Sequence, residues 1–109
     1  MGKYLLVETR DPFDSADVRT TYDLVHGLAD DGSEVTVFMV QNGVLPARKA
    51  SSAADQIGQL TSKATVLADD FSLRERGIAA DELVEGVTPS EIGAVVDLSL
   101  DDGRKVIWH

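Results

Sequence analysis

Short apolar runs recur along the chain, separated by longer segments in which apolar and polar residues mix. Four runs stand out, each three to six residues long: Tyr4–Val7, Val35–Val40, Ala64–Ala68 and Val106–Trp108. Runs of this length without regular polar alternation are typical of strands buried on both faces of a sheet. A further apolar stretch, Leu83–Val87, predicts another strand.

The segments between the first runs carry the spacing of amphipathic helices. From Asp17 to Asp31, apolar residues recur three or four positions apart, which predicts one buried helical face. The residues of this face are Val18, Tyr22, Val25 and Ala29. A second helix is predicted around Ala53, Ile57 and Leu60, which share a face in the same way. Gly32 is suited to end the first helix.

The third run continues into a predicted helix. Asp69 and Asp70 end the run, and Ser72 and Glu75 follow in the S-x-x-E spacing of a capping box. The serine would then cap a helix that begins near Leu73. Ligands of α/β proteins often lie at such junctions, because free backbone N–H groups converge there. Paired aspartates and a serine also fit ordinary capping, so both interpretations stay open.

The last helix has the clearest start signal in the chain. Thr88 is predicted as its N-cap, with Pro89 in the first helical position and Glu91 completing the capping box. The spacing of the apolar residues beyond this point predicts a buried face. Its members are Ile92, Val95, Val96 and Leu100. A turn over Asp101 to Gly103 would lead into the final strand.

Alternating strands and helices predict right-handed crossovers and an α/β fold of three layers, with a parallel sheet between helices. The length of 109 residues fits a single domain over residues 1–109. No apolar run approaches the roughly 20 residues that span a bilayer, and Glu8 comes too early for a signal peptide. We therefore expect a cytoplasmic protein without membrane attachment.

Composition argues against several kinds of chemistry. The chain has no cysteine, which excludes a thiol nucleophile, thiolate metal ligands and a persulfide on its own side chains. Its imidazoles, His26 and His109, are too few for a multi-histidine zinc site within one chain. A net charge of −9 and scattered basic residues argue against a nucleic-acid partner. We expect no cofactor and no bound metal.

The loops after the first three predicted strands should bring polar residues together, because parallel strands end at one edge of a sheet. The candidate ligand-binding residues are Glu8, Arg10, Gln41, Asn42, Asp69 and Asp70. Arg10 could orient a small anion or pair with Asp11 or Asp14 at the surface. The carboxylates could hold Mg²⁺ or accept a phosphoryl group, but no glycine-rich phosphate loop accompanies them. No residue is assigned a catalytic role.

The order of four segments resembles the DsrE/DsrF-like proteins of sulfur-relay systems, which include TusD-type subunits. These segments are YLLVE, EVTVFMVQNGV, RERGI and ELVEGVTPSEIG. The resemblance covers essentially the whole chain and implies a five-stranded parallel sheet, assembly as a homotrimer or homohexamer, and sulfur carried as a cysteine persulfide. It aligns the family's active cysteine with Asp69 and, less well, with Ser72. Neither side chain can hold a transferable sulfur atom, so the chain resembles a member that lacks the active cysteine.

These observations lead to a hypothesis of function. We expect a cysteine-free DsrE/DsrF-like protein that acts as a non-catalytic, oligomeric binding or scaffold component. Its partner would be a sulfur-carrier protein or a small anionic ligand. The alternative is an enzyme that binds a small ligand or a metal ion with the polar residues at the strand ends, without a persulfide.

Overall fold

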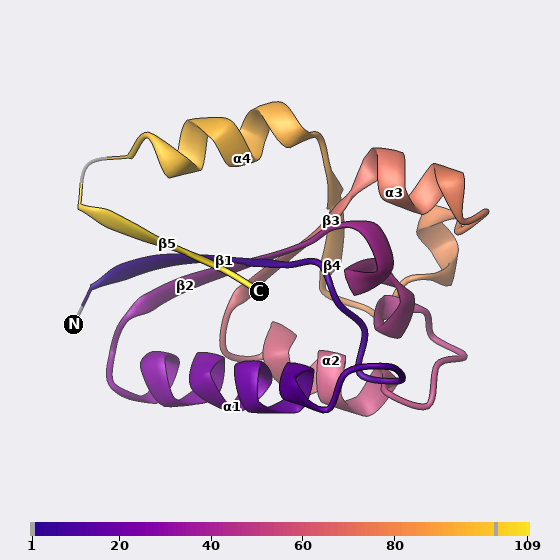
Figure 1. Cartoon of the computed structure of the whole chain (residues 1–109), viewed down its shortest axis with the longest axis horizontal. Helices are drawn as coiled ribbons and strands as arrows, with labels where there is room; N and C mark the ends of the chain where they lie inside the picture. The colour runs from indigo at the N-terminus through magenta and orange to yellow at the C-terminus, as the bar shows by residue number, and fades with distance from the viewer. Residues whose placement is uncertain (1, 102) are drawn as a thin grey trace.

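The computed structural model describes residues 2–101 and 103–109. Five parallel strands form one sheet in the order β4-β3-β2-β1-β5 (Figure 1). The strands are Lys3–Glu8 (β1), Glu34–Met39 (β2), Thr65–Asp69 (β3), Val87–Ser90 (β4) and Arg104–Trp108 (β5). The predicted parallel α/β fold is thus confirmed. The predicted turn before β5 includes Asp102, which lies outside the described residues.

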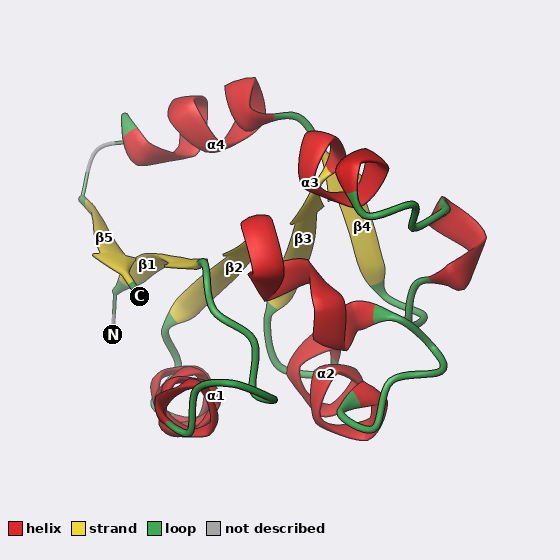
Figure 2. Cartoon of the chain, turned by 45° about the vertical axis from the view of Figure 1, so that its right-hand side comes forward, coloured by secondary structure: helices red, strands yellow, loops and turns green. Residues whose placement is uncertain are grey.

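Helices cover both faces of the sheet. α1 (Asp17–Asp30) and α2 (Ala54–Thr61) lie on one face, and α4 (Ile92–Ser99) lies over the other (Figure 2). The strand order explains this, because β1, β2 and β3 advance in one direction whereas the chain returns from β4 to β5 in the other. With right-handed crossovers, the reversed direction puts α4 on the opposite face.

Three short helical segments complete the chain. The 3₁₀ helix η1 (Gln41–Ala47) follows β2, and α3 (Asp70–Glu75) follows β3, so both begin at the carboxyl edge of the sheet. A second 3₁₀ helix, η2 (Ala80–Glu82), precedes β4. The helix α3 therefore begins earlier than the start near Leu73 that the capping-box spacing predicts.

The buried apolar residues form two unequal clusters. The larger packs α1 and α2 against the sheet through side chains that include Val25, Ile57 and Val37. The smaller lies under α4, and its buried members are Leu5, Val7, Phe38 and Val95. Because side chains alternate along a strand, β1 and β2 supply both clusters, which explains their continuous apolar runs.

The region around β4 differs from the prediction. Thr88 and Pro89 belong to β4 rather than to a helix start, and α4 begins at Ile92 with Glu91 as an N-cap residue that makes no side-chain capping bond. Pairing of Val66 with Val87, continued along β3 and β4, outweighs the local capping signals. Proline is tolerated here because β4 is an edge strand, where one N–H need not donate to a neighbour.

The strand predicted over Leu83–Val87 is also displaced, because β4 starts at its last residue. Leu83 instead forms an isolated antiparallel bridge with Arg48, the residue after the end of η1. Its side chain is buried in the larger cluster. The apolar character of this stretch therefore reflects burial beside η1 and α2 rather than strand formation.

The predicted buried face of α4 is largely wrong. Only Val95 of its four members is buried, whereas Ile92, Val96 and Leu100 are 64%, 50% and 78% exposed. The helix approaches the sheet mainly through Val95, with Leu98 packing beside it. Helical spacing correctly marked an apolar side of α4, but only Val95 of that side reaches the buried cluster on the sheet.

None of the helices formed by residues 2–101 and 103–109 is both long and apolar enough to cross a membrane.

Candidate functional site

The six candidate residues lie at the carboxyl ends of β1, β2 and β3, which form neighbouring strands of the sheet. These residues differ in how far they are buried. Glu8 is fully buried and Asp69 is 5% exposed. Asp70 is half-buried, and the remaining three, Arg10, Gln41 and Asn42, are exposed. The hydrogen bonds around these residues show two separate clusters instead of one shared rim.

The first cluster joins β3 to the loop after β2. Asp69 is the N-cap of α3, where its Oδ2 accepts from the backbone N of Ser72 at 3.0 Å and from the Ser72 Oγ at 2.6 Å. The Ser72 Oγ in turn accepts from the backbone N of Gln41 at 2.8 Å. Asp69 is therefore the capping residue, not Ser72 as the spacing predicted. The serine lies one turn into the helix and links it to Gln41.

Gln41 has an unusual backbone conformation. Its φ of 55° is the one positive value at a non-glycine residue in the part of the chain that the structure describes. Such a conformation is held at a cost of about 1 kcal/mol or more and persists only where neighbouring contacts impose it. The bond to Ser72 is one such contact, and it turns the chain sharply from β2 into η1.

Arg76 extends this cluster. Its Nε and Nη2 donate to the Asn42 Oδ1 at 3.2 and 3.1 Å, and its Nη1 donates to the Ser72 carbonyl oxygen at 3.2 Å. The loops after β2 and β3 are thus held together by one arginine. The sequence did not single out Arg76 for this role, because its partner lies 34 residues away.

The second cluster is built around Glu8. Both carboxylate oxygens lie 2.9 Å from the Nδ1 of His109, and Oε2 also accepts from the Arg10 backbone N at 3.2 Å. When the Glu8 carboxylate is ionised it only accepts hydrogen bonds, and Nδ1 is then the donor. His109 is held in place by two more bonds: its N donates to the Val7 oxygen at 2.9 Å, and its carbonyl oxygen accepts from the Thr9 Oγ1 at 2.9 Å.

Sequence reasoning gave His109 no role in this site. The residue reaches Glu8 because β5 pairs with β1, so that Trp108 lies opposite Val7. The pair is separated by 101 residues, and no local motif connects its members. Predicting this contact requires the order of the strands in the sheet.

Asp11 and Tyr22 lie close to the Glu8 cluster. Asp11 is buried, and its Oδ1 accepts from the backbone N–H groups of Phe13 and Asp14 at 2.9 Å each. Ion pairing of Arg10 with Asp11 or Asp14 is not found among the described residues. The Tyr22 hydroxyl is buried and has no hydrogen-bond partner within that part of the chain. Burial, and then the charges of Glu8 and Asp11, raise the pKa of Tyr22.

Asp70 forms an ion pair within α3. Its Oδ2 lies 3.5 Å from the Nη1 of Arg74 in an exposed pair one helical turn apart. With Asp69, Phe71 and Glu91, these side chains line an open cleft of about 290 Å³. Across residues 2–101 and 103–109, no three His, Asp or Glu side chains are grouped so that they could hold a metal ion.

A family model of the DsrE/DsrF-like family matches residues 2–108. The chain belongs to the DsrE/DsrF-like family. It is a member without cysteine, so it lacks the side chain that carries sulfur in the active members of the DsrE/DsrF-like family. No curated protein of known function matches it.

Solved structures of similar fold come from both archaea and bacteria. A protein of unknown function, MTH1491 from Methanobacterium thermoautotrophicum, shares 24% identity at a TM-score of 0.86, with 100% of each chain covered. The ychN protein from E. coli shares 18% identity at a TM-score of 0.90, also with 100% of each chain covered. BT1422 from Bacteroides thetaiotaomicron shares 14% identity at a TM-score of 0.77, covering 98% of this chain and 95% of its own. At these identities the likeness shows the fold of the DsrE/DsrF-like chain and nothing of its ligands.

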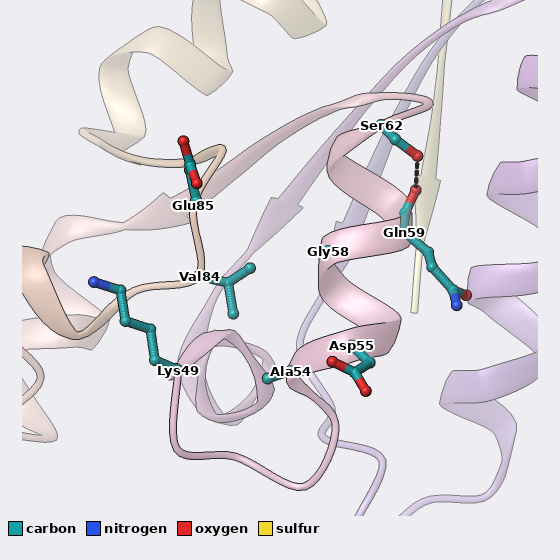
Figure 3. A pocket seen from close by; sticks show the side chains of 8 residues that line it. All are labelled: Lys49, Ala54, Asp55, Gly58, Gln59, Ser62, Val84 and Glu85. Carbon is teal, nitrogen blue, oxygen red and sulfur yellow. Dashed lines mark hydrogen bonds between the residues drawn. The ribbon is translucent and has the colours of Figure 1, made fainter.

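A wider groove of this DsrE/DsrF-like domain runs along α2, away from the two clusters. Figure 3 shows Asp55, Gly58 and Ser62 on the helix, with Lys49, Val84 and Glu85 on the chain opposite. The groove measures about 610 Å³ but is shallow and open to solvent. Ser62 Oγ donates to the Gln59 carbonyl oxygen within the helix, at 2.6 Å. Its polar groups do not converge on one point, so it adds no candidate residues.

Replacing Asp69 should destabilise the protein, because Asp69→Ala removes the cap of α3 and two buried hydrogen bonds. We expect the free energy of unfolding to fall by about 1–3 kcal/mol. Asp69→Asn, which can still cap, should lose less. Asp70→Ala is the matched control and should change stability by no more than about 0.5 kcal/mol, since it breaks an exposed pair. Urea unfolding measures all three; equal losses for Asp69→Ala and Asp70→Ala would contradict the assigned cap.

Tyr22 should make stability fall at high pH. Tyrosine in the unfolded chain ionises near pH 10, whereas the pKa of Tyr22 is raised in the fold, so above pH 10 the unfolded state holds fewer protons. Stability should then decline with rising pH, by up to about 1.4 kcal/mol per pH unit.

Tyr22→Phe should remove this part of the decline and, at neutral pH, should leave stability equal or raised, because an unpartnered buried hydroxyl is lost. Tyr4→Phe keeps Tyr22 and serves as the control. Denaturant unfolding between pH 7 and pH 11 measures both effects. An identical decline in Tyr22→Phe and the native chain would show that Tyr22 does not cause it.

Proposed function

We propose that this DsrE/DsrF-like protein acts by binding, as a non-catalytic oligomeric scaffold component related to sulfur-relay proteins, and carries no sulfur on its own chain. The observation behind this proposal is the state of the residue that the family resemblance aligns with the active cysteine. That residue is Asp69, and its carboxylate caps α3 in a buried position.

Ser72, the second position that the resemblance aligns with the cysteine, is also held by hydrogen bonds. Its Oγ donates to Asp69 and accepts from the Gln41 N, and the residue is 3% exposed. A hydroxyl becomes a nucleophile when a base removes its proton next to an accessible substrate. Ser72 has a carboxylate partner but no access, so it supports a structural role in this proposal.

A second line of support comes from the exposed apolar side chains on α4 and on the edge strand β5. They are Ile92, Val96, Leu100, Val106 and Trp108, between 36% and 78% exposed. Apolar patches of this kind mark contact surfaces in soluble proteins. Assembly as a homotrimer or homohexamer, with a sulfur-carrier protein as a further partner, would cover them.

The alternative of an enzyme built on the strand-end residues has less support. The side chains it would use bond to other protein groups: Glu8 to His109, Asp69 to Ser72, and Asn42 to Arg76. Arg10 is the exposed cation left to receive a small anion such as a carboxylate, and a single arginine at an open surface holds anions weakly.

The proposed loss of sulfur chemistry can be tested by restoring a thiol. The native chain should form no covalent sulfur adduct with cysteine persulfide, whereas Asp69→Cys should accept sulfur, because thiolates are favoured at a helix N-terminus. Intact-mass spectrometry measures the adduct, and Ser62→Cys on α2 is the control for an ordinary exposed thiol. An adduct on the native chain, or no faster reaction of Asp69→Cys than of Ser62→Cys, would contradict the proposal.

The proposed assembly can be tested by charge insertion on α4. Native mass spectrometry should show a trimer or hexamer of the native chain, and Leu100→Glu should shift it toward smaller species. Leu24→Glu, on α1 at the opposite face, is the matched control and should leave the assembly intact; the two leucines are 78% and 44% exposed. A monomeric native chain, or equal effects of both variants, would remove this part of the proposal.

A further inference from the structure

An apolar cavity of about 320 Å³ lies between α4 and the sheet. Its deep wall consists of side chains from the two central strands β1 and β2 together with Val95 of α4, namely Leu5, Val7, Phe38 and Val95. The outer wall comes from α4 and β5 and includes Val96, Val106 and Trp108. Three polar residues, Thr9, Gln41 and Ser99, complete the lining with Val40 and Ile92.

Of the predicted apolar side of α4 only Val95 is buried against the sheet, and the cavity lies beside it. Figures 1 and 2 show α4 over one face of the sheet, with α1 and α2 on the other. Protein interiors are normally filled to the density of organic crystals, and unfilled apolar space costs stability. A space of this size next to buried Leu5, Val7 and Phe38 is suited to an occupant.

The lining limits the charge of that occupant. Among residues 2–101 and 103–109, no charged side chain lines the cavity. Burying an ion against apolar walls without a partner is strongly unfavourable. The walls therefore select a neutral molecule, in contrast to the small anion considered for the strand-end residues.

The polar lining limits its hydrogen bonding. Thr9 Oγ1 already donates to the His109 carbonyl oxygen, and Ser99 Oγ donates to the Val96 carbonyl oxygen. Each hydroxyl hydrogen is used, so both oxygens can only accept a further bond. A ligand that reaches either one must supply a donor.

From the volume, charge and hydrogen bonding we propose that this cavity binds a small, neutral, mainly apolar molecule that carries a hydrogen-bond donor. At the roughly 30 Å³ that a water molecule occupies, the volume corresponds to about ten non-hydrogen atoms, the size of a two-ring aromatic amine or alcohol. The volume lies at the lower end of known ligand pockets, which are mainly apolar with a few polar groups. The cavity shares Ile92, Val96, Val106 and Trp108 with the surface proposed for assembly, so a bound molecule and a second copy would compete for this face.

Trp108 provides the measurement, because it is the chain's one tryptophan and it forms part of the cavity wall. Titration of the full-length protein with 1-naphthylamine should change the Trp108 emission saturably, with one molecule bound per chain. Naphthalene lacks the donor and should bind more weakly. Naphthalene-1-sulfonate carries a charge and should bind at least about tenfold more weakly than the amine.

Val95→Phe fills the cavity from α4 and should weaken 1-naphthylamine binding at least about tenfold. Ala94→Phe places the same side chain on the neighbouring position, which does not line the cavity, and is the matched control. Ser99→Phe narrows the cavity from an exposed position and decides the matter if Val95→Phe does not fold.

Three results would overturn the proposal. The first is an emission change that does not saturate or that Val95→Phe and Ser99→Phe leave unaltered. The second is equal binding of the amine and the sulfonate, which would indicate a general apolar surface. The third is an oligomer that excludes 1-naphthylamine while a dissociating variant such as Leu100→Glu admits it, which would show that a second copy fills the cavity. The scaffold proposal would stand in the first two cases and would gain support in the third.

Discussion

The turn that leaves β2 holds the functional edge of this domain together. Val40 donates to the Glu8 carbonyl oxygen at the end of β1, and Gln41 donates to Ser72 at the start of α3. Two residues after Gln41, Gly43 lies so close to the Glu8 carbonyl oxygen that any side chain would overlap it. The four-residue turn Val40–Gly43 therefore fixes the spacing of three strand ends, and the positive φ of Gln41 is the conformational cost of doing so.

This constraint shapes what the edge can do. The turn draws Ser72 and Asp69, the residues that we propose to align with the family's active cysteine, into a buried chain of hydrogen bonds. The Glu8 carboxylate likewise forms hydrogen bonds with His109 and with the backbone N of Arg10. The DsrE/DsrF-like architecture is thus kept with its strand-end polar groups satisfied internally. Exposed apolar side chains lie instead around α4 and β5.

The two faces of the sheet were not equally predictable. α1 and the first three strands follow from local periodicity, because Val18, Tyr22 and Val25 and the continuous apolar runs are buried as their spacing requires. Around β4, local signals and tertiary pairing disagree. The residue types at Thr88 and Pro89 predict a helix start, yet pairing with β3 places both residues in the edge strand β4. Capping preferences amount to about 1 kcal/mol each and yield to a full ladder of strand pairing.

The candidate site shows the same division. Position along the strands was enough to expect Glu8, Gln41 and Asp69 at one edge of the sheet, since parallel strands end together. Their hydrogen-bond partners could not be predicted from local sequence. His109 meets Glu8 because β5 pairs with β1, and Arg76 meets Asn42 because α3 packs beside η1. Neither contact leaves a mark in local spacing, because both join segments far apart in the chain.

Amino-acid order alone settled the parallel α/β class, the family resemblance and the absence of thiol chemistry, because these depend on periodicity and composition. Tertiary structure decided which carboxylate caps α3, which histidine meets Glu8, and that α4 leaves an apolar cavity beside the sheet. These outcomes depend on strand order and on the space between layers, which arise only when distant segments pack against one another.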